Sequence, residues 1–174
     1  SNVHQDGDTS AGYPGWEVFD KVNNDGAKAW ITYDPSYSNG SQTLNHNLGT
    51  ETGGVSTTVN GEYIILHMPY KLKLDYFKIK ERAANTTNAP ASGKIYGSND
   101  GSTWVELKSF SGLTYTDTDD VFTFVSVNAP VAYSRIAMVV QTITNTAPTW
   151  MGIGDLRYYG HRENDLVRFP DPTN

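Results

Sequence analysis

Short runs of β-branched and aromatic residues, separated by turn residues, recur along the whole chain. The clearest example is KIYGSNDGSTWVELKSF, in which two apolar runs flank the turn Asn99-Asp100-Gly101. A turn of this composition between two such runs is typical of a β-hairpin. Similar runs at even spacing predict about eight strands, and no stretch has a helical period of useful length. The sequence therefore predicts an all-β protein, an antiparallel two-sheet β-sandwich.

Two central segments predict particular kinds of strand. GEYIILHM, residues 61–68, is continuously apolar and predicts a buried strand. LKLDYFKIKER, residues 72–82, alternates, but its apolar residues change parity near Asp75, which predicts a bulge or bend there. The segment GWEVFDKV, residues 15–22, is interpreted as a short extended segment, and Trp16, Trp30 and Trp104 are expected in the core.

Length and charge bound the organisation of the chain. Its 174 residues correspond to one domain with tails, and a net charge of −6 with no basic run argues against nucleic acid as a partner. The absence of Cys excludes disulfides and thiolate metal sites. We expect residues 1–12 to be a flexible lead-in, residues 13–160 the sandwich and residues 161–174 an exit linker. We interpret the chain as a piece of a larger multidomain protein.

No catalytic motif stands out. The sequence lacks G-x-S-x-G, the phosphate-binding loop, G-x-G-x-x-G and H-E-x-x-H. A glycosidase needs two converging carboxyl groups, and the sequence brings no two of its loop acids together. These acids are Asp34, Glu51, Asp117, Asp119 and Asp120. We therefore expect a non-catalytic protein.

Several of these segments, in this order, resemble one family. GWEVFD, GEYIILHMPYKLKLDYFKIKER, YGSNDGSTW, AYSRIAMVV and IGDLRYYG are similar to segments of the discoidin, or coagulation-factor C-type (F5/8 type C), domain. The resemblance covers residues 13–160 and implies the galactose-binding-like jelly-roll sandwich shared with many carbohydrate-binding modules, which binds ligands through loops at one end. The tail HRENDLVRFPDPTN resembles a segment of virion proteins of large algal DNA viruses. An extracellular or virion-surface location is therefore expected.

The resemblance also implies a structural Ca²⁺ site. Family members often hold Ca²⁺ where the first FD loop meets the acidic residue of the closing strand. Asp20 and Asp155 match these two positions, and Asn23 and Asp25 of the intervening loop could add oxygen ligands, which Ca²⁺ prefers. The loop is longer than usual, and Lys28 stands where many members have Thr. An alternative is that the loop is only a turn.

In sugar-binding relatives an Arg follows the strand that FKIKER matches, and an aromatic residue lies five positions before the acidic position. Arg82 and Trp150 fill these positions, and the two side chains should meet at one loop end. An aromatic face packs against a sugar ring and a guanidinium binds its hydroxyls. Further candidate ligand-binding residues are Tyr33, Tyr37, His46, Asn85 and Asn88. A polar residue common in relatives after the matching Trp is replaced by Ile31.

Three functions remain open at this point. The first is a carbohydrate-binding module that serves adhesion to a glycan. The second is a structural or protein-interaction module of a larger assembly, in which Trp150 covers the core and Arg82 is an ordinary solvated residue. A lipid binder is disfavoured, because the loops are rich in Thr, Asn and Ser and lack apolar tips on a basic background.

Overall fold

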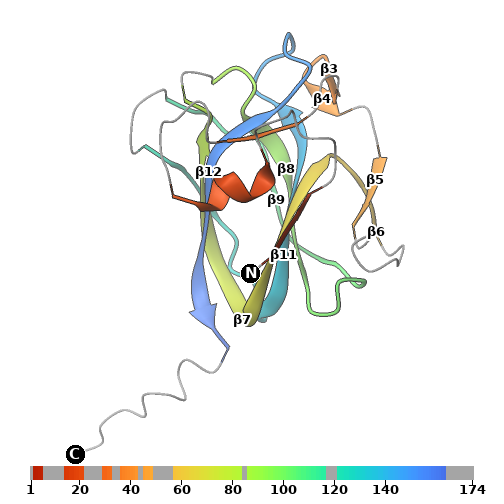
Figure 1. Ribbon diagram of the computed structural model, residues 1–174, viewed down its shortest axis with the longest axis vertical. Coiled ribbons are helices and arrows are strands. Elements are labelled where there is room, and N and C mark those ends of the chain that lie inside the picture. The colour runs from red at the N-terminus through yellow and green to blue at the C-terminus, as the bar shows by residue number, and fades with distance from the viewer. Residues whose placement is uncertain are drawn as a thin grey trace, which may run out of the picture.

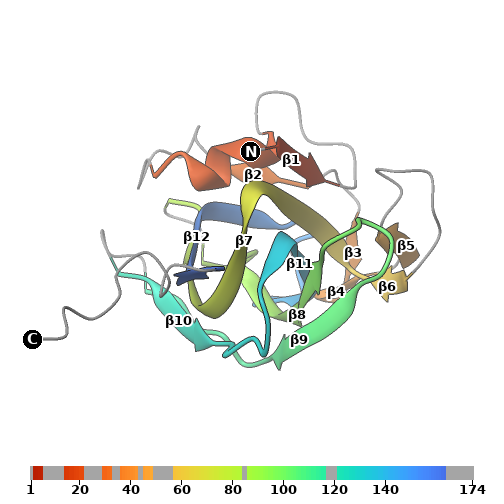
Figure 2. The same cartoon turned by 90° about the horizontal axis from the view of Figure 1, so that it is seen from below.

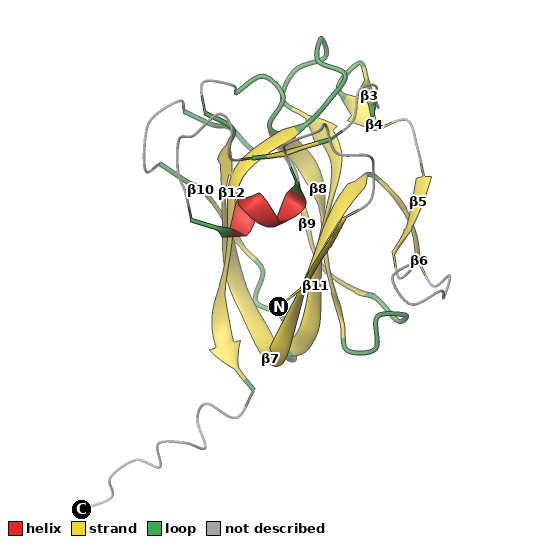
Figure 3. Cartoon of the chain, in the orientation of Figure 1, coloured by secondary structure: helices red, strands yellow, loops and turns green. Residues whose placement is uncertain are grey.

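The computed structural model describes residues 2–5, 14–21, 29–32, 36–42, 45–48, 57–83, 86–116 and 121–163. It is an antiparallel β-sandwich with one short 3₁₀ helix, η1, at Gly15–Phe19 (Figures 1 and 3). The strands are β1 (Asn2–Gln5), β2 (Trp30–Ile31), β3 (Tyr37–Ser38), β4 (Ser41–Gln42), β5 (Asn45–Leu48), β6 (Thr57–Asn60), β7 (Glu62–Glu81), β8 (Pro90–Ser98), β9 (Val105–Phe110), β10 (Thr123–Ser126), β11 (Tyr133–Ile143) and β12 (Gly152–Arg162). The predicted fold class is confirmed.

The 20-residue strand β7 belongs to both layers of the sandwich. Its first half pairs with β1 and β11, and β11 continues the layer through β8 to β9. Its second half pairs with β10 and β12, and β12 continues to β2. Figure 2 shows β7 turning from one layer into the other. The segments 61–68 and 72–82, expected as two strands, are therefore one.

Two predicted features of β7 are present. The register with β12 passes from Tyr76 opposite Tyr159 to Leu74 opposite Gly160, so that Asp75 is skipped and forms the predicted irregularity. Ile64 and Ile65 point to opposite faces of the strand, and both are fully buried. Ile64 packs in the main core between the layers and Ile65 in a second cluster with Trp104. The prediction of a strand buried on both faces is confirmed.

Two predictions about the amino-terminal part are wrong. Residues 15–19 of GWEVFDKV form η1 rather than an extended segment. Trp16 lies on η1 and is 54% exposed, whereas Trp30 and Trp104 are buried as expected. Within the segment expected as a lead-in, Asn2–Gln5 pair with β7 as β1. At the other end, β12 continues to Arg162, two residues beyond the expected boundary, and residues 164–174 lie outside the described part.

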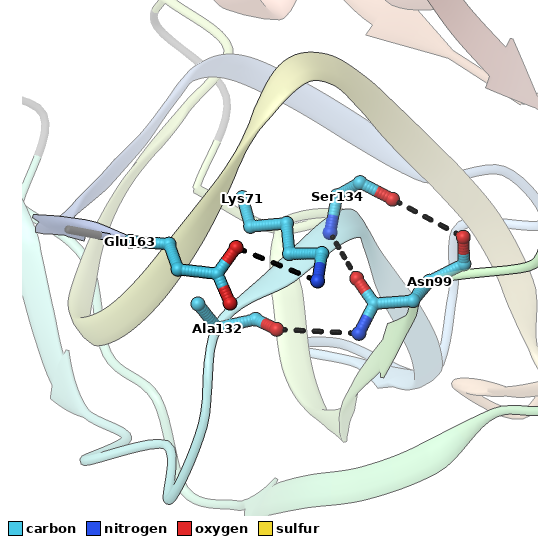
Figure 4. A network of polar contacts seen from close by, with 5 residues as sticks. All are labelled: Lys71, Asn99, Ala132, Ser134 and Glu163. Carbon is cyan, nitrogen blue, oxygen red and sulfur yellow. Dashed lines mark hydrogen bonds and ion pairs between the residues drawn. The ribbon is translucent and has the colours of Figure 1, made fainter.

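The end of the sandwich where β7 changes layer is tied together by polar contacts (Figure 4). Asn99, in the turn between β8 and β9, accepts from the backbone N–H of Ser134 at 3.0 Å and donates to the carbonyl of Ala132 at 3.3 Å. Lys71 forms an ion pair of 3.4 Å with Glu163.

Among the described residues no helix is long and apolar enough to span a membrane.

Candidate functional site

Trp150 lies at the other end of the sandwich, two residues before the start of β12, between two residues with fixed backbones. The carbonyl of Thr149 accepts from the N–H of Ser36 at 2.8 Å. The N–H of Met151 donates to Oγ1 of Thr32 at 2.9 Å, and the carbonyl of Met151 accepts from the N–H of Thr32 at 3.1 Å. Met151 is fully buried, whereas Trp150 is half-buried. The flanking anchors therefore hold the Trp150 side chain at the surface.

Arg82 directly follows β7 and reaches the same place. Cζ of its guanidinium lies 6.0 Å from the centroid of the Trp150 ring, at the outer limit of a cation–π contact. Gly152 lies between the two: a Cβ added there would be 3.3 Å from Cζ3 of Trp150 and 3.4 Å from Cβ of Arg82. The structure thus brings the two predicted side chains together over a glycine, a contributor that the sequence did not indicate.

Asn88 lies beside this pair. Its carbonyl accepts from the N–H of Gly152 at 3.0 Å, which ties the loop before β8 to the start of β12. The Asn88 side chain is completely buried, and neither its Nδ2 nor its Oδ1 has a hydrogen-bond partner in the described structure. A buried amide normally satisfies both groups, because leaving one unpaired costs about 1–3 kcal/mol. The buried side chain therefore offers no surface to a ligand at this end, and Asn88 contributes through its backbone carbonyl.

The remaining predicted ligand contacts have different outcomes. The prediction that Tyr37 forms a wall of the site is wrong, because its side chain is fully buried. Its hydroxyl donates to the carbonyl of Val140 at 3.0 Å. Burial also raises its pKa well above the ordinary value. The backbone of His46 pairs with Val59 of β6 in the small sheet formed by β5 and β6, and its side chain is outside the described structure. Tyr33 and Asn85 lie outside the described residues.

Of the predicted calcium ligands, Asp155 is buried in β12. Arg157 binds its carboxylate: Nη2 lies 2.6 Å from Oδ2, and Nε lies 3.1 Å from each oxygen. Burial raises the pKa of Asp155, and the neighbouring charge of Asp20 acts in the same direction, whereas Arg157 and Lys80 act against it. Arg157 and Lys80 therefore offset part of the cost of burying this carboxylate.

The described ligands do not make a calcium site by themselves. No group of three or more His, Asp or Glu side chains that could hold a metal ion is found in the described ranges. Asn23 and Asp25, which would complete the predicted set, lie outside them. Calcium binding stays a prediction, and it requires the Asp155 carboxylate to exchange Arg157 for the ion.

Comparison with protein-family models and with curated proteins finds no match. Comparison with solved structures finds several at full-domain coverage. The family 32 carbohydrate-binding module of Clostridium perfringens NanJ, solved in complex with galactose, is 15% identical with a TM-score of 0.58, covering 90% of this chain and 91% of that one.

Two further structures belong to the same group. An F5/8 type C domain from Bacteroides fragilis is 13% identical with a TM-score of 0.62, covering 91% of this chain and 90% of that one. The family 62 module of Clostridium thermocellum Xyl5A is 16% identical with a TM-score of 0.57, covering 92% and 94%. The chain has the β-sandwich fold of F5/8 type C domains and family 32 carbohydrate-binding modules.

Proposed function

We propose that this chain is a non-catalytic module that binds a glycan through the loop end formed by Arg82 and Trp150. The observation that carries the proposal is the meeting of these two side chains, 68 residues apart in the sequence, with 6.0 Å between the guanidinium and the ring centroid. The galactose complex of a module with the same fold supports the choice of ligand class.

The chemistry of the two groups is complementary to a sugar. The ring of Trp150 offers an apolar face to the C–H side of a pyranose. The guanidinium of Arg82 presents several N–H donors in a fixed plane to the ring hydroxyls. The pair therefore offers one group for the ring and one for the hydroxyls.

Such a site binds weakly on its own. A monosaccharide makes few contacts, so a single site is expected to bind with roughly −4 to −6 kcal/mol, which is high micromolar to millimolar. Useful attachment then needs several copies of the module in a larger extracellular protein. The proposed role is adhesion of the parent protein to a glycoconjugate.

The test is a glycan array on the isolated domain, followed by calorimetric titration with the best neutral glycan. Trp150→Ala and Arg82→Ala should each weaken binding by roughly 1–3 kcal/mol, which removes detectable binding at this affinity. Trp16→Ala, which removes an exposed Trp from η1, is the matched control and should bind normally. If both site variants still bind the glycan, the binding site lies elsewhere on the domain. An array with no hits, together with a specific oligomer in solution, would favour the protein-interaction function.

A further inference from the structure

Away from Trp150, a cleft lies along the later residues of β12, at the seam between the two layers. Two hollows of about 460 and 470 Å³ share four lining residues, Leu66, Tyr70, Tyr158 and Tyr159. Because they share these walls, we treat them as one feature, the seam cleft, bounded by the bend of β7 on one side and by β12 on the other. Each hollow has the volume of an ordinary small-ligand site, about 300–1,000 Å³.

The walls of the seam cleft are aromatic and held in place. Tyr158 packs against Phe19 and Phe77, with ring centroids 6.0 and 6.5 Å apart. Tyr159 stacks on Tyr76 with 4.7 Å between the centroids and 10° between the planes. Figure 1 shows η1, which ends at Phe19, between β12 and the first half of β7. The cleft is therefore formed by packed elements rather than by loops.

Tyr158 carries an unused polar group at this cleft. Its hydroxyl is buried and has no hydrogen-bond partner in the described structure, and burial strongly raises its pKa. The hydroxyl is therefore neutral at physiological pH and can both donate and accept. Leaving it unpaired costs about 1–3 kcal/mol. Because the oxygen is closed to solvent, a ligand in the cleft reaches it only if the surrounding side chains move.

The two ends of the seam cleft carry cations with no ion pair among the described residues. Arg162 lies in the first hollow with its Cζ 4.0 Å from the centroid of Tyr70, so the guanidinium lies over an aromatic wall. Lys21 lies at the second hollow, two residues after the end of η1, and its backbone has a left-handed φ of 63°. A guanidinium stacked on a ring keeps its N–H edges available for a carboxylate.

Three of the described acids near these cations have basic partners, and a fourth, Asp20, adjoins Lys21 in the sequence. Glu163, adjacent to Arg162 in sequence, pairs with Lys71 at 3.4 Å (Figure 4). Asp75 pairs with Nδ1 of His161 at 2.7 Å. Asp155 is held by Arg157, as described above. The first hollow is lined by Arg162 and by no acidic residue, so a ligand carboxylate there meets a cation.

We propose that the seam cleft binds a sugar unit that bears a carboxylate. Arg162 pairs with the carboxylate, and the tyrosine walls pack against the ring. This site is separate from the Arg82 and Trp150 end and does not depend on it. The eleven residues from Gly152 to Arg162 in extended β-structure span about 30 Å. One module could then hold a neutral and an acidic part of the same glycan.

The experiment uses the Trp150→Ala variant of the whole chain, which removes the proposed neutral site. It is titrated with 3′-sialyllactose, with methyl β-glucuronide and with lactose, while amide ¹H–¹⁵N shifts are recorded. We expect at least one acidic probe to bind and to shift the amides of residues 156–162 rather than those of residues 149–152, whereas lactose leaves residues 156–162 unchanged. Arg162→Gln should weaken the acidic probe at least tenfold, and Tyr70→Ala should have a similar effect.

Lys108→Gln removes an exposed positive charge from β9 and is the matched control, which should bind normally. The proposal is overturned if neither acidic probe binds, if the shifts concentrate at residues 149–152, or if Arg162→Gln binds as tightly as the parent. Binding of anionic lipid vesicles in place of the acidic sugars would also overturn it. Because the Trp150 site is disabled throughout, these outcomes do not depend on the proposed neutral-glycan function.

Discussion

The Arg157 guanidinium lies on the buried carboxylate of Asp155, two residues before it in the same strand, with 2.6 Å between Nη2 and Oδ2. The Asp155 side chain is 1% exposed and that of Arg157 is 25% exposed. Residues i and i+2 point to the same face of a strand, so the ion pair is built into β12. The internal cation offsets part of the cost of burying the carboxylate, so the response of the domain to calcium and to pH should depend on this ion pair.

Arg157→Met should destabilise the domain. The change keeps much of the side-chain volume but leaves the Asp155 carboxylate without its closest cation. Breaking a fully buried pair costs about 3–5 kcal/mol; because Arg157 is partly exposed and Lys80 remains nearby, we expect about 2–3 kcal/mol. Urea denaturation at pH 7 measures the loss. The conservative double variant, Asp155→Asn with Arg157→Met, should recover part of it, and a single variant as stable as the parent would contradict the prediction.

The same variant should be sensitive to pH. A carboxyl group whose folded pKa is raised binds its proton more tightly in the folded state, so its contribution to stability falls as pH rises through the interval above its ordinary value of 3.8. Removing Arg157 raises this folded pKa further and widens the interval. The deficit of Arg157→Met should therefore be smaller near pH 4 than at pH 7, as measured by urea denaturation at both values. An equal deficit at both would exclude Asp155 as the cause.

Calcium should stabilise the domain if Asn23 and Asp25 complete the predicted site. An ion that binds only the folded state raises stability by RT ln(1 + [Ca²⁺]/Kd). We expect chelation to lower the melting temperature by several degrees, and Asp155→Ala to remove the difference between chelated and calcium-loaded samples. Differential scanning calorimetry measures both. Identical melting curves in chelator and in excess Ca²⁺ would mean that Arg157 alone serves the Asp155 carboxylate.

The turn between β8 and β9 has the opposite pH behaviour. Asp100 accepts from the backbone N–H groups of Thr103 at 2.7 Å and Ser102 at 2.8 Å, and these bonds lower its pKa well below 3.8. The stabilisation is present above the unfolded pKa and is lost as pH falls below it. Asp100→Ala should destabilise the domain at pH 7, and the difference from the parent should shrink below about pH 3.8. Thermal melts at pH 7 and pH 3 measure this; a pH-independent difference would contradict it.

The features that the sequence predicted correctly are those set by local chemistry. The hairpin at Asn99-Asp100-Gly101 was predictable because its turn is closed by its own side chain and by Gly101, which has a φ of +76°. Likewise, the parity change at Asp75 followed directly from the alternation of side chains along one strand.

Features set by distant pairing were missed. Asn2–Gln5 have no strand pattern of their own and are extended because β7 offers a free edge. The first predicted strand ended at Met68, directly before Pro69, yet β7 continues through this proline. Residues 68–71 have no partner in the register with β11, so the missing N–H of Pro69 breaks no hydrogen bond between these two strands. Placing Arg82 beside Trp150 needed the family resemblance, since neither residue's own sequence context indicates the other.

Gly152 separates the effects of the proposed glycan site from those of the fold. Gly152→Ala places a Cβ 3.3 Å from Cζ3 of Trp150 and 3.4 Å from Cβ of Arg82, so both side chains must shift by a few tenths of an ångström. We expect several-fold weaker glycan binding with a loss of stability of about 1 kcal/mol or less. Gly93→Ala is the contrasting variant, because its Cβ would lie 2.0 Å from the backbone carbonyl oxygen of Val139, which cannot move away easily. It should lose more stability, roughly 1–3 kcal/mol, while its folded fraction binds the glycan normally. Calorimetric titration and urea denaturation of both variants provide the comparison, and unchanged affinity in Gly152→Ala would place the sugar away from the Trp150 and Arg82 pair.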